Sequence, residues 1–81
     1  MKIKVLLFAQ ARQIAGNDQL EVDIESGATV GDLRESISDS FPELSQLLAR
    51  SGIALDQEYA VDGDIVTSDA EVAMIPPVSG G

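Results

Sequence analysis

The chain has 81 residues, contains neither cysteine nor histidine, and carries a formal net charge of −9 from 14 acidic and 5 basic residues. This length is sufficient for one small domain, and a hydrophobic fraction of 44% is typical of a folded protein. The missing residue types exclude disulfides, Cys or His metal sites, cysteine nucleophiles and histidine bases. The composition therefore argues against a self-sufficient enzyme, and the negative charge argues against binding nucleic acid or anionic membranes.

Negative charge dominates the last third of the sequence. Every basic residue lies at or before Arg50, and six acidic residues follow it: Asp56, Glu58, Asp62, Asp64, Asp69 and Glu71. This surface serves either solubility or docking onto a basic partner. The apolar run within Lys2–Phe8 is too short for a signal peptide, and no segment reaches transmembrane length. We expect a cytoplasmic protein.

The first part of the chain predicts a β-hairpin. The segment Lys2–Ala9 alternates, so that one face, expected to be core, carries Ile3, Val5, Leu7 and Ala9. The polar segment Gln10–Asn17 predicts a loop with Ile14 and Ala15 as apolar anchors. Leu20, Val22 and Ile24 then alternate with acidic residues, as in a half-buried antiparallel strand.

A helix is predicted over residues 30–40. Thr29 and Asp32 have the spacing of a capping box, in which each side chain accepts a hydrogen bond from a free backbone N–H. Apolar residues then follow at helical spacing: Val30, Leu33, Ile37 and Phe41. Pro42 either ends this helix or begins another turn, and Leu44, Leu47 and Leu48 indicate a short further helix ending at Ser51-Gly52.

The remaining residues predict short strands. Ile53–Val61 forms one or two strands interrupted near Asp56-Gln57. Asp62-Gly63-Asp64 lacks the spacing of a calcium loop and is interpreted as a turn. Glu71–Ile75 is the last strand, with Val72 and Met74 on one side and Ala73 and Ile75 on the other. Pro76-Pro77 ends the sheet, because proline cannot donate to the ladder.

This order of elements predicts an α+β fold of the ubiquitin-like β-grasp type, a mixed sheet with one main helix packed on one face. The last strand is expected beside the first and parallel to it, through a right-handed crossover. The β-grasp domain is expected to span residues 1–76, and a flexible Gly-Gly tail residues 77–81.

The tail carries the chemical interpretation. The prolines favour an extended course for the tail, which ends in Pro77, Val78, Ser79, Gly80 and Gly81. Glycine has no Cβ and can pass through a narrow channel. A carboxylate at Gly81 becomes reactive when an ATP-dependent enzyme converts it to an acyl-adenylate, which a sulfur nucleophile can turn into a thiocarboxylate. Without cysteine, the terminus is the plausible point of sulfur attachment; the alternative is a frayed end.

Three segments resemble the small subunits of molybdopterin synthases: Val5–Arg12, Gln57–Tyr59 and above all Glu71–Gly81, which reads EVAMIPPVSGG. The likeness spans the whole chain. The sequence departs from the family pattern at Asp56, where asparagine is common, and at Ser68–Ala70, which replaces a frequent Asp-Gly-Asp turn.

The resemblance implies a sulfur carrier in molybdenum cofactor biosynthesis. A ubiquitin-activating-like adenylyltransferase adenylates Gly81 with ATP and magnesium, and a sulfurtransferase supplies sulfur for the thiocarboxylate. Residues 77–80 enter the active site of the large synthase subunit, where sulfur passes to cyclic pyranopterin monophosphate. The resemblance also implies a heterotetramer of two small and two large subunits, in which this chain binds no cofactor or metal and supplies no catalytic side chain.

Strand parity predicts a partner interface. If the first strand turns its core face to the helix, Phe8 points outward, and by the same reasoning Ile75 does so on the last strand. Neighbouring strands bring the two together near the tail, where paired exposed apolar groups mark an interface. Burying both would contribute roughly 3–5 kcal/mol. The alternative is ordinary scattered surface hydrophobes, and Tyr59 is either a core-edge residue or a partner contact.

Three other functions stay open. The chain could carry sulfur for another route, such as thiamine thiazole formation or tRNA thiolation. It could instead be a ubiquitin-like modifier, which would join Gly81 to lysines of other proteins, or a β-grasp scaffold with an idle tail. A thiocarboxylate at Gly81 is expected of carriers, and an isopeptide bond of a modifier.

Overall fold

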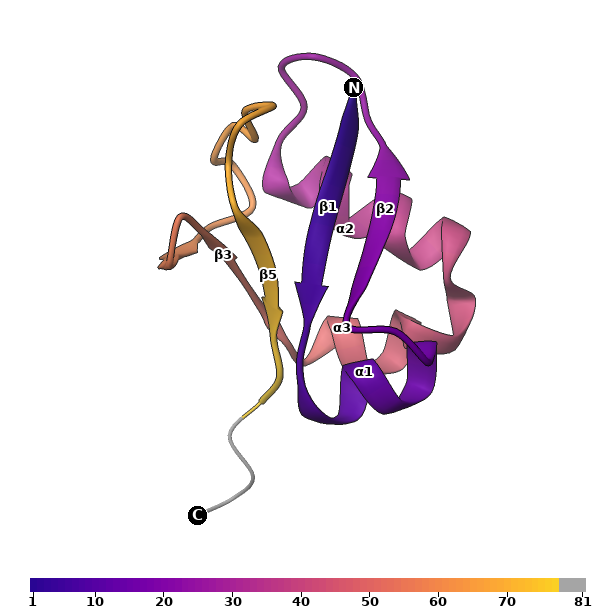
Figure 1. Ribbon diagram of the computed structural model, residues 1–81. Coiled ribbons are helices and arrows are strands. Elements are labelled where there is room, and N and C mark those ends of the chain that lie inside the picture. The colour runs from indigo at the N-terminus through magenta and orange to yellow at the C-terminus, as the bar shows by residue number, and fades with distance from the viewer. Residues whose placement is uncertain (78–81) are drawn as a thin grey trace.

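The computed structural model describes residues 1–77, which form one five-stranded sheet with helices packed on one face (Figure 1). The strands run in the order β2-β1-β5-β3-β4 across the sheet. Their bounds are β1 (Lys2–Leu7), β2 (Gln19–Asp23), β3 (Gly52–Leu55), β4 (Glu58–Ala60) and β5 (Val72–Ile75). β5 is parallel to β1, and the other neighbouring pairs are antiparallel. The predicted mixed sheet of the α+β, β-grasp type is confirmed.

The first strand has the predicted parity over most of its length. Ile3, Val5 and Leu7 are buried in the core, and Leu6 and the lysines lie on the opposite face. The prediction for Ala9 was wrong, because β1 ends at Leu7 and Ala9 is exposed. Ala9 has a left-handed φ of 49°, which turns the chain out of the sheet.

A helix, α1 (Ala9–Ala15), occupies the segment for which a loop was predicted. Its residues include several strong helix formers, alanine, glutamine and arginine, and Ala11 is fully buried against the core. Gly16 ends the helix with a φ of 74° and donates its N–H to the carbonyl of Arg12 at 2.9 Å. Of the two predicted anchors, Ile14 is exposed, whereas Ala15 is partly buried and packs against the core; Ala11, which was not predicted, is the buried residue of this segment.

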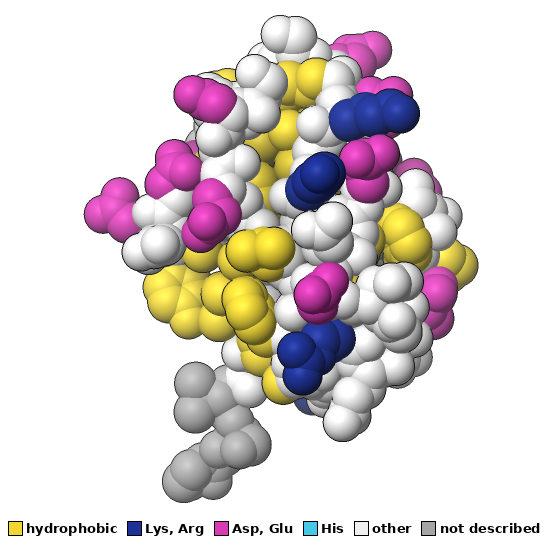
Figure 2. Space-filling view, viewed as in Figure 1, with side chains coloured by type: hydrophobic (Ala, Val, Ile, Leu, Met, Phe, Trp, Pro, Cys, Tyr) yellow, Lys and Arg dark blue, Asp and Glu magenta, His cyan; other side chains and the backbone are white. Residues whose placement is uncertain are grey.

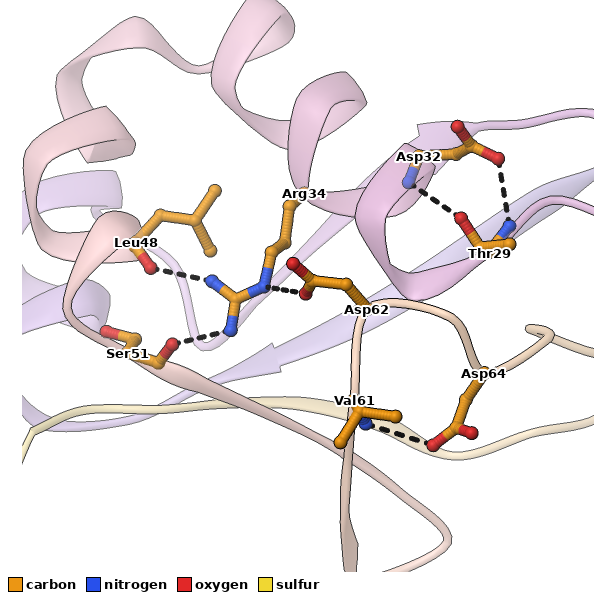
Figure 3. Close-up of polar contacts among 8 residues, drawn as sticks. All are labelled: Thr29, Asp32, Arg34, Leu48, Ser51, Val61, Asp62 and Asp64. Atoms are coloured by element: carbon orange, nitrogen blue, oxygen red, sulfur yellow. Dashed lines mark hydrogen bonds and ion pairs between the residues drawn. The ribbon is translucent and has the colours of Figure 1, made fainter.

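The main helix, α2 (Val30–Ser40), has the predicted bounds. The amide of Asp32 donates to Thr29 Oγ1 at 3.2 Å, and the amide of Thr29 donates to Asp32 Oδ2 at 3.0 Å (Figure 3). This capping box satisfies two N–H groups that the first turn leaves free. Val30, Leu33 and Ile37 form its fully buried stripe.

The chain after α2 continues as η1 (Pro42–Leu44) and α3 (Ser45–Ala49). Pro42 therefore begins a new turn, one of the two outcomes that the sequence allowed. Leu44, Leu47 and Leu48 are buried as expected. The predicted end of this helix at Ser51-Gly52 was too late, since α3 ends at Ala49 and Gly52 is the first residue of β3.

A tight hairpin joins β3 to β4. Asp56 and Gln57 have left-handed φ values of 52° and 71°, as a two-residue turn of this kind requires. The amide of Asp56 donates to the carbonyl of Glu71 at 2.8 Å, and the amide of Glu71 donates to Asp56 Oδ1 at 2.9 Å. The turn is therefore fixed to the residue that precedes β5.

The helices cover one face of the sheet and leave its other face uncovered. In Figure 1, α2 and α3 lie behind the sheet, and α1 lies at the end where β1 finishes. The core fills the space between the sheet and these helices. Among residues 1–77, no helix has the length and apolar character needed to cross a membrane.

Candidate partner-docking site

The uncovered side of the sheet carries an apolar hollow. Its lining comes from four strands and the turns beside them: Leu6, Phe8, Ala54, Gln57, Tyr59, Glu71, Ala73 and Ile75. We call this set the sheet-face hollow. Figure 2 shows an apolar group low on this face, next to the end of β5. The three residues predicted for an interface, Phe8, Tyr59 and Ile75, all belong to the hollow.

Strand register explains the shape of the hollow. Leu6 pairs with Ala73, Ala73 with Ala54, and Ala54 with Tyr59. Directly paired residues point to the same face of a sheet, so these four form one row. The two alanines in the middle of the row, Ala54 and Ala73, have little solvent-exposed surface, and their short side chains form a flat floor. Larger side chains stand at both ends, which makes the surface concave.

Phe8 reaches the hollow because of the chain reversal after β1. Its backbone is extended, with φ −132° and ψ 156°, and it is the N-cap residue of α1. The left-handed Ala9 then directs the chain into the helix. A non-glycine residue in this conformation costs about 1–2 kcal/mol. The consequence is that Phe8 stays on the uncovered face with 45% of its surface exposed.

The carboxyl-terminal segment leaves the sheet beside the hollow. β5 ends at Ile75, which lines the hollow, and Pro76 and Pro77 follow without regular structure. Of the residues predicted for the tail, Pro77 is exposed. The other four, Val78, Ser79, Gly80 and Gly81, lie outside the described residues.

Acidic side chains border the apolar group. Figure 2 shows several of them above it, on the side of β3. Glu71 lines the hollow directly, and Glu58 is exposed next to Tyr59 on β4. A binding surface that is apolar in its centre and acidic at its border favours a partner surface with basic groups around an apolar projection.

The segment Asp62-Gly63-Asp64 forms a turn, as predicted. Asp64 Oδ2 accepts the amide of Val61 at 3.0 Å, and Asp62 Oδ1 lies 3.2 Å from Arg34 Nε (Figure 3). Both carboxylates are thus engaged within the protein. Within the described range 1–77, no three His, Cys, Asp or Glu residues are grouped in a way that could hold a metal ion.

Sequence reasoning missed part of the lining. Leu6 and Ala73 could have been predicted from strand parity, because Leu6 lies on the same strand face as Phe8, and Ala73 on the same strand face as Ile75. Ala54 was missed because its position depends on the register of β3 with β4. A two-residue turn at Asp56-Gln57 would have given this register, but neither residue is a glycine that would mark it.

The fold and the hollow define a ubiquitin-like β-grasp protein with an apolar sheet face next to its carboxyl-terminal segment. The model of the ThiS family matches residues 5–81 of this chain. The chain belongs to the ThiS family.

Individual relatives support this assignment. The chain is 40% identical over 81 residues to a molybdopterin synthase sulfur carrier subunit of Arabidopsis thaliana, covering 100% of this chain and 84% of that protein. It is 34% identical to small archaeal modifier protein 1 of Haloferax volcanii, covering 93% of this chain and 95% of that protein. A crystal structure of the latter protein superposes with a TM-score of 0.85 at 29% identity, with complete coverage of both chains.

Proposed function

We propose that this chain is the sulfur carrier subunit of a molybdopterin synthase. The observation that carries the proposal is full-length similarity to proteins of that name, at 40% identity in Arabidopsis thaliana and 39% in Chlamydomonas reinhardtii. Membership of the ThiS family supports the same conclusion. The absence of cysteine and histidine from the sequence supports a role in which the chain carries sulfur and a partner supplies the catalytic groups.

The proposed chemistry takes place at the carboxylate of Gly81. A carboxylate oxygen attacks the α-phosphorus of ATP, and pyrophosphate leaves, with magnesium held by the activating enzyme. The terminal sulfur of a sulfurtransferase persulfide then attacks the acyl carbon and displaces AMP, which gives an acyl disulfide. A second thiol, supplied by the partner enzymes or by an added reductant, cleaves its S–S bond, so that the thiocarboxylate is released and a disulfide is left on the thiol side. Transfer of that sulfur to cyclic pyranopterin monophosphate, with water attacking the acyl carbon to supply the oxygen, returns the carboxylate, so that the carrier can be charged again. Because activation consumes ATP, we place this cycle in the cytoplasm.

The sheet-face hollow is the proposed contact with the large synthase subunit. Ile75 lines the hollow, and one residue, Pro76, separates it from the tail that begins at Pro77. A partner seated on the hollow is therefore placed to receive the tail in its active site. Phe8 and Tyr59 supply exposed aromatic surface, which is the residue class that dominates interface energetics. We further propose an assembly of two carriers with two large subunits, which is what the resemblance to molybdopterin synthase small subunits implies.

The test is intact mass spectrometry of the purified chain. The chain is incubated with ATP, magnesium, the cognate activating enzyme, a sulfurtransferase and a sulfur source. We expect the mass to rise by the difference between one sulfur and one oxygen. A chain lacking Gly81 should stay unchanged, and a Gly63→Ala chain, altered at an open surface turn, should be charged normally. An unchanged mass with an activating enzyme that charges another carrier would refute the proposal.

A second function, protein modification, is supported by the similarity to small archaeal modifier protein 1. In that case Gly81 would form an isopeptide bond with lysines of other proteins. The last basic residue is Arg50, so trypsin would leave residues 51–81 on the target. A protease that cleaves after glutamate is preferable, because cleavage after Glu71 leaves the short remnant Val72–Gly81. Finding this remnant on lysines in cells establishes the modifier, and a thiocarboxylate without such conjugates favours the carrier.

A further inference from the structure

Gly52 meets Tyr59 at an unusually short separation. A Cβ atom placed on Gly52 would lie 2.9 Å from Cε1 and 3.1 Å from Cδ1 of the Tyr59 ring. Real Cβ atoms essentially never show the first of these distances. The ring therefore occupies the space in which any other residue at position 52 would place its side chain.

The backbone gives no other reason for glycine at this position. Among the described glycines, Gly16 and Gly27 have positive φ values, whereas Gly52 has the ordinary conformation of a strand. Gly52 is the first residue of β3, and a glycine within a strand often marks the close approach of another group. Here the approaching group is the aromatic ring of Tyr59.

The strand register explains the contact. Tyr59 pairs directly with Ala54, and Gly52 lies two residues before Ala54 on the same face of β3. The ring is therefore directed along the diagonal of the β3–β4 pair, over the glycine. Gly52 in turn pairs with Ile75 of β5. The ring thus extends from β4 toward Ile75 and forms one wall of the sheet-face hollow.

Burial does not explain why the ring is held in this way. Tyr59 is 74% exposed, and it is not part of the hydrophobic core. An exposed tyrosine in solution would sample several rotamers, and fixing them at the moment of binding costs free energy. A ring already resting on a glycine loses less freedom when a partner arrives.

We infer that Gly52 is a positioning residue of the docking surface, which acts by letting the Tyr59 ring lie across β3 as a preformed wall of the sheet-face hollow. The inference rests on the proposed function in one respect, since the partner is the large synthase subunit. A side chain at position 52 would lift the ring away from the sheet. The hollow would lose a wall, and Tyr59 would meet the partner in the wrong orientation.

The test compares four chains in binding to the cognate large subunit: wild type, Gly52→Ala, Tyr59→Ala and the double variant. We expect Gly52→Ala to weaken binding about tenfold, as expected for a change that disturbs a central interface aromatic residue. In the Tyr59→Ala background the same change should have little effect, because no ring remains to be displaced. Gly63→Ala is the matched control, since a Cβ there meets nothing within 4 Å and the expected affinity is that of wild type.

A second measurement reads the ring position without a partner. In a proton NMR spectrum, a Tyr59 ring stacked over Gly52 should shift one of the two Hα resonances of Gly52 upfield. Tyr59→Ala should abolish that shift. Equal affinity of Gly52→Ala and wild type, equal losses in both Tyr59 backgrounds, or an unshifted Hα would each overturn the inference. Failure of the wild-type chain to bind the large subunit refutes the proposed function instead, and the Hα shift then still decides whether Gly52 positions the ring.

Discussion

Arg34 and Asp62 join the main helix to the loop that precedes the last strand. Arg34 Nε lies 3.2 Å from Asp62 Oδ1, in the geometry of an ion pair without a directed hydrogen bond (Figure 3). The other two nitrogens of the guanidinium donate to backbone carbonyls, Nη1 to Leu48 at 2.9 Å and Nη2 to Ser51 at 2.7 Å. One side chain of α2 therefore binds the end of α3, the residue that precedes β3 and the loop at Asp62.

Arg34→Ala should destabilise the free chain by about 2–3 kcal/mol. The variant leaves the carbonyls of Leu48 and Ser51 without their charged donor, and a partly buried acceptor that loses its partner costs about 1–3 kcal/mol. The measurement is the free energy of unfolding in urea. Arg34→Lys keeps a charged donor and should recover part of the lost stability. The recovery should be incomplete, because an ammonium group lacks the planar geometry with which the guanidinium reaches both carbonyls.

Asp62→Asn is the contrasting variant, with an expected loss below about 1 kcal/mol, because exposed ion pairs contribute little. The Asp62 side chain is 75% exposed, and its backbone carbonyl keeps its bond to the amide of Gly31. If Asp62→Asn destabilised the chain as much as Arg34→Ala, the ion pair rather than the carbonyl contacts would be the main contribution of Arg34.

Thr29→Ala should lower the free energy of unfolding by about 1 kcal/mol, the usual cost of removing an N-cap hydroxyl. The reason is that the amide of Asp32 loses its acceptor at Thr29 Oγ1. In a domain of this size, such a loss lowers the melting temperature by about 4–8 °C. Thr29→Ser keeps the hydroxyl and should restore most of the stability. Equal melting temperatures for the alanine and serine variants would show that the cap does not stabilise the fold.

The two longer helices show how far local sequence determines secondary structure here. α2 has an apolar stripe at helical spacing and a capping box, so both its existence and its bounds could be predicted. α1 has one buried residue, Ala11, and its N-cap Phe8 makes no side-chain cap. Its helix-forming composition was the available signal. Its position depends on a left-handed Ala9 and on packing against the rest of the chain, which a single sequence does not reveal.

The residues of the sheet-face hollow also differ in whether the sequence alone could predict their positions. Phe8 and Ile75 could be placed together from strand parity, because alternation is a local property of each strand. The contact of Tyr59 with Gly52 could not, because it depends on the register of β3 with β4 and on a side-chain rotamer. Nothing in the sequence around Gly52 distinguishes a glycine needed for space from one needed for a turn.

Gln57→Gly should stabilise the chain by roughly 0.5–1 kcal/mol, because relief of the left-handed cost of about 1–2 kcal/mol exceeds the roughly 0.5–1 kcal/mol that the chain entropy of glycine takes away. Gln57 has a φ of 71°, a conformation that glycine adopts without the steric cost borne by other residues. The measurement is again unfolding in urea. Glu58→Gly, one residue later and within β4, should instead destabilise by about 0.5–1 kcal/mol, because glycine weakens an ordinary strand position. Destabilisation by both variants would mean that the side chain of Gln57 stabilises the hairpin more than its backbone conformation strains it.

Phe8→Ser should weaken binding to the partner while leaving the free energy of unfolding nearly unchanged. Phe8 is the N-cap residue of α1, its backbone is already extended, and it makes no cap hydrogen bond, so serine introduces a favoured capping side chain at that position. The new cap offsets part of the apolar packing that the smaller side chain gives up. Because Phe8 is 45% exposed, the free energy of unfolding should change by less than about 1 kcal/mol.

Affinity of the Phe8→Ser chain for the large synthase subunit should fall about tenfold or more, because the substitution removes an aromatic side chain from the sheet-face hollow. Ile14→Ser is the matched control, since Ile14 is similarly exposed at 40% but does not line the hollow. Isothermal titration of both variants against the large subunit checks the prediction. A decrease in affinity that is the same for both would place the docking surface elsewhere on the molecule.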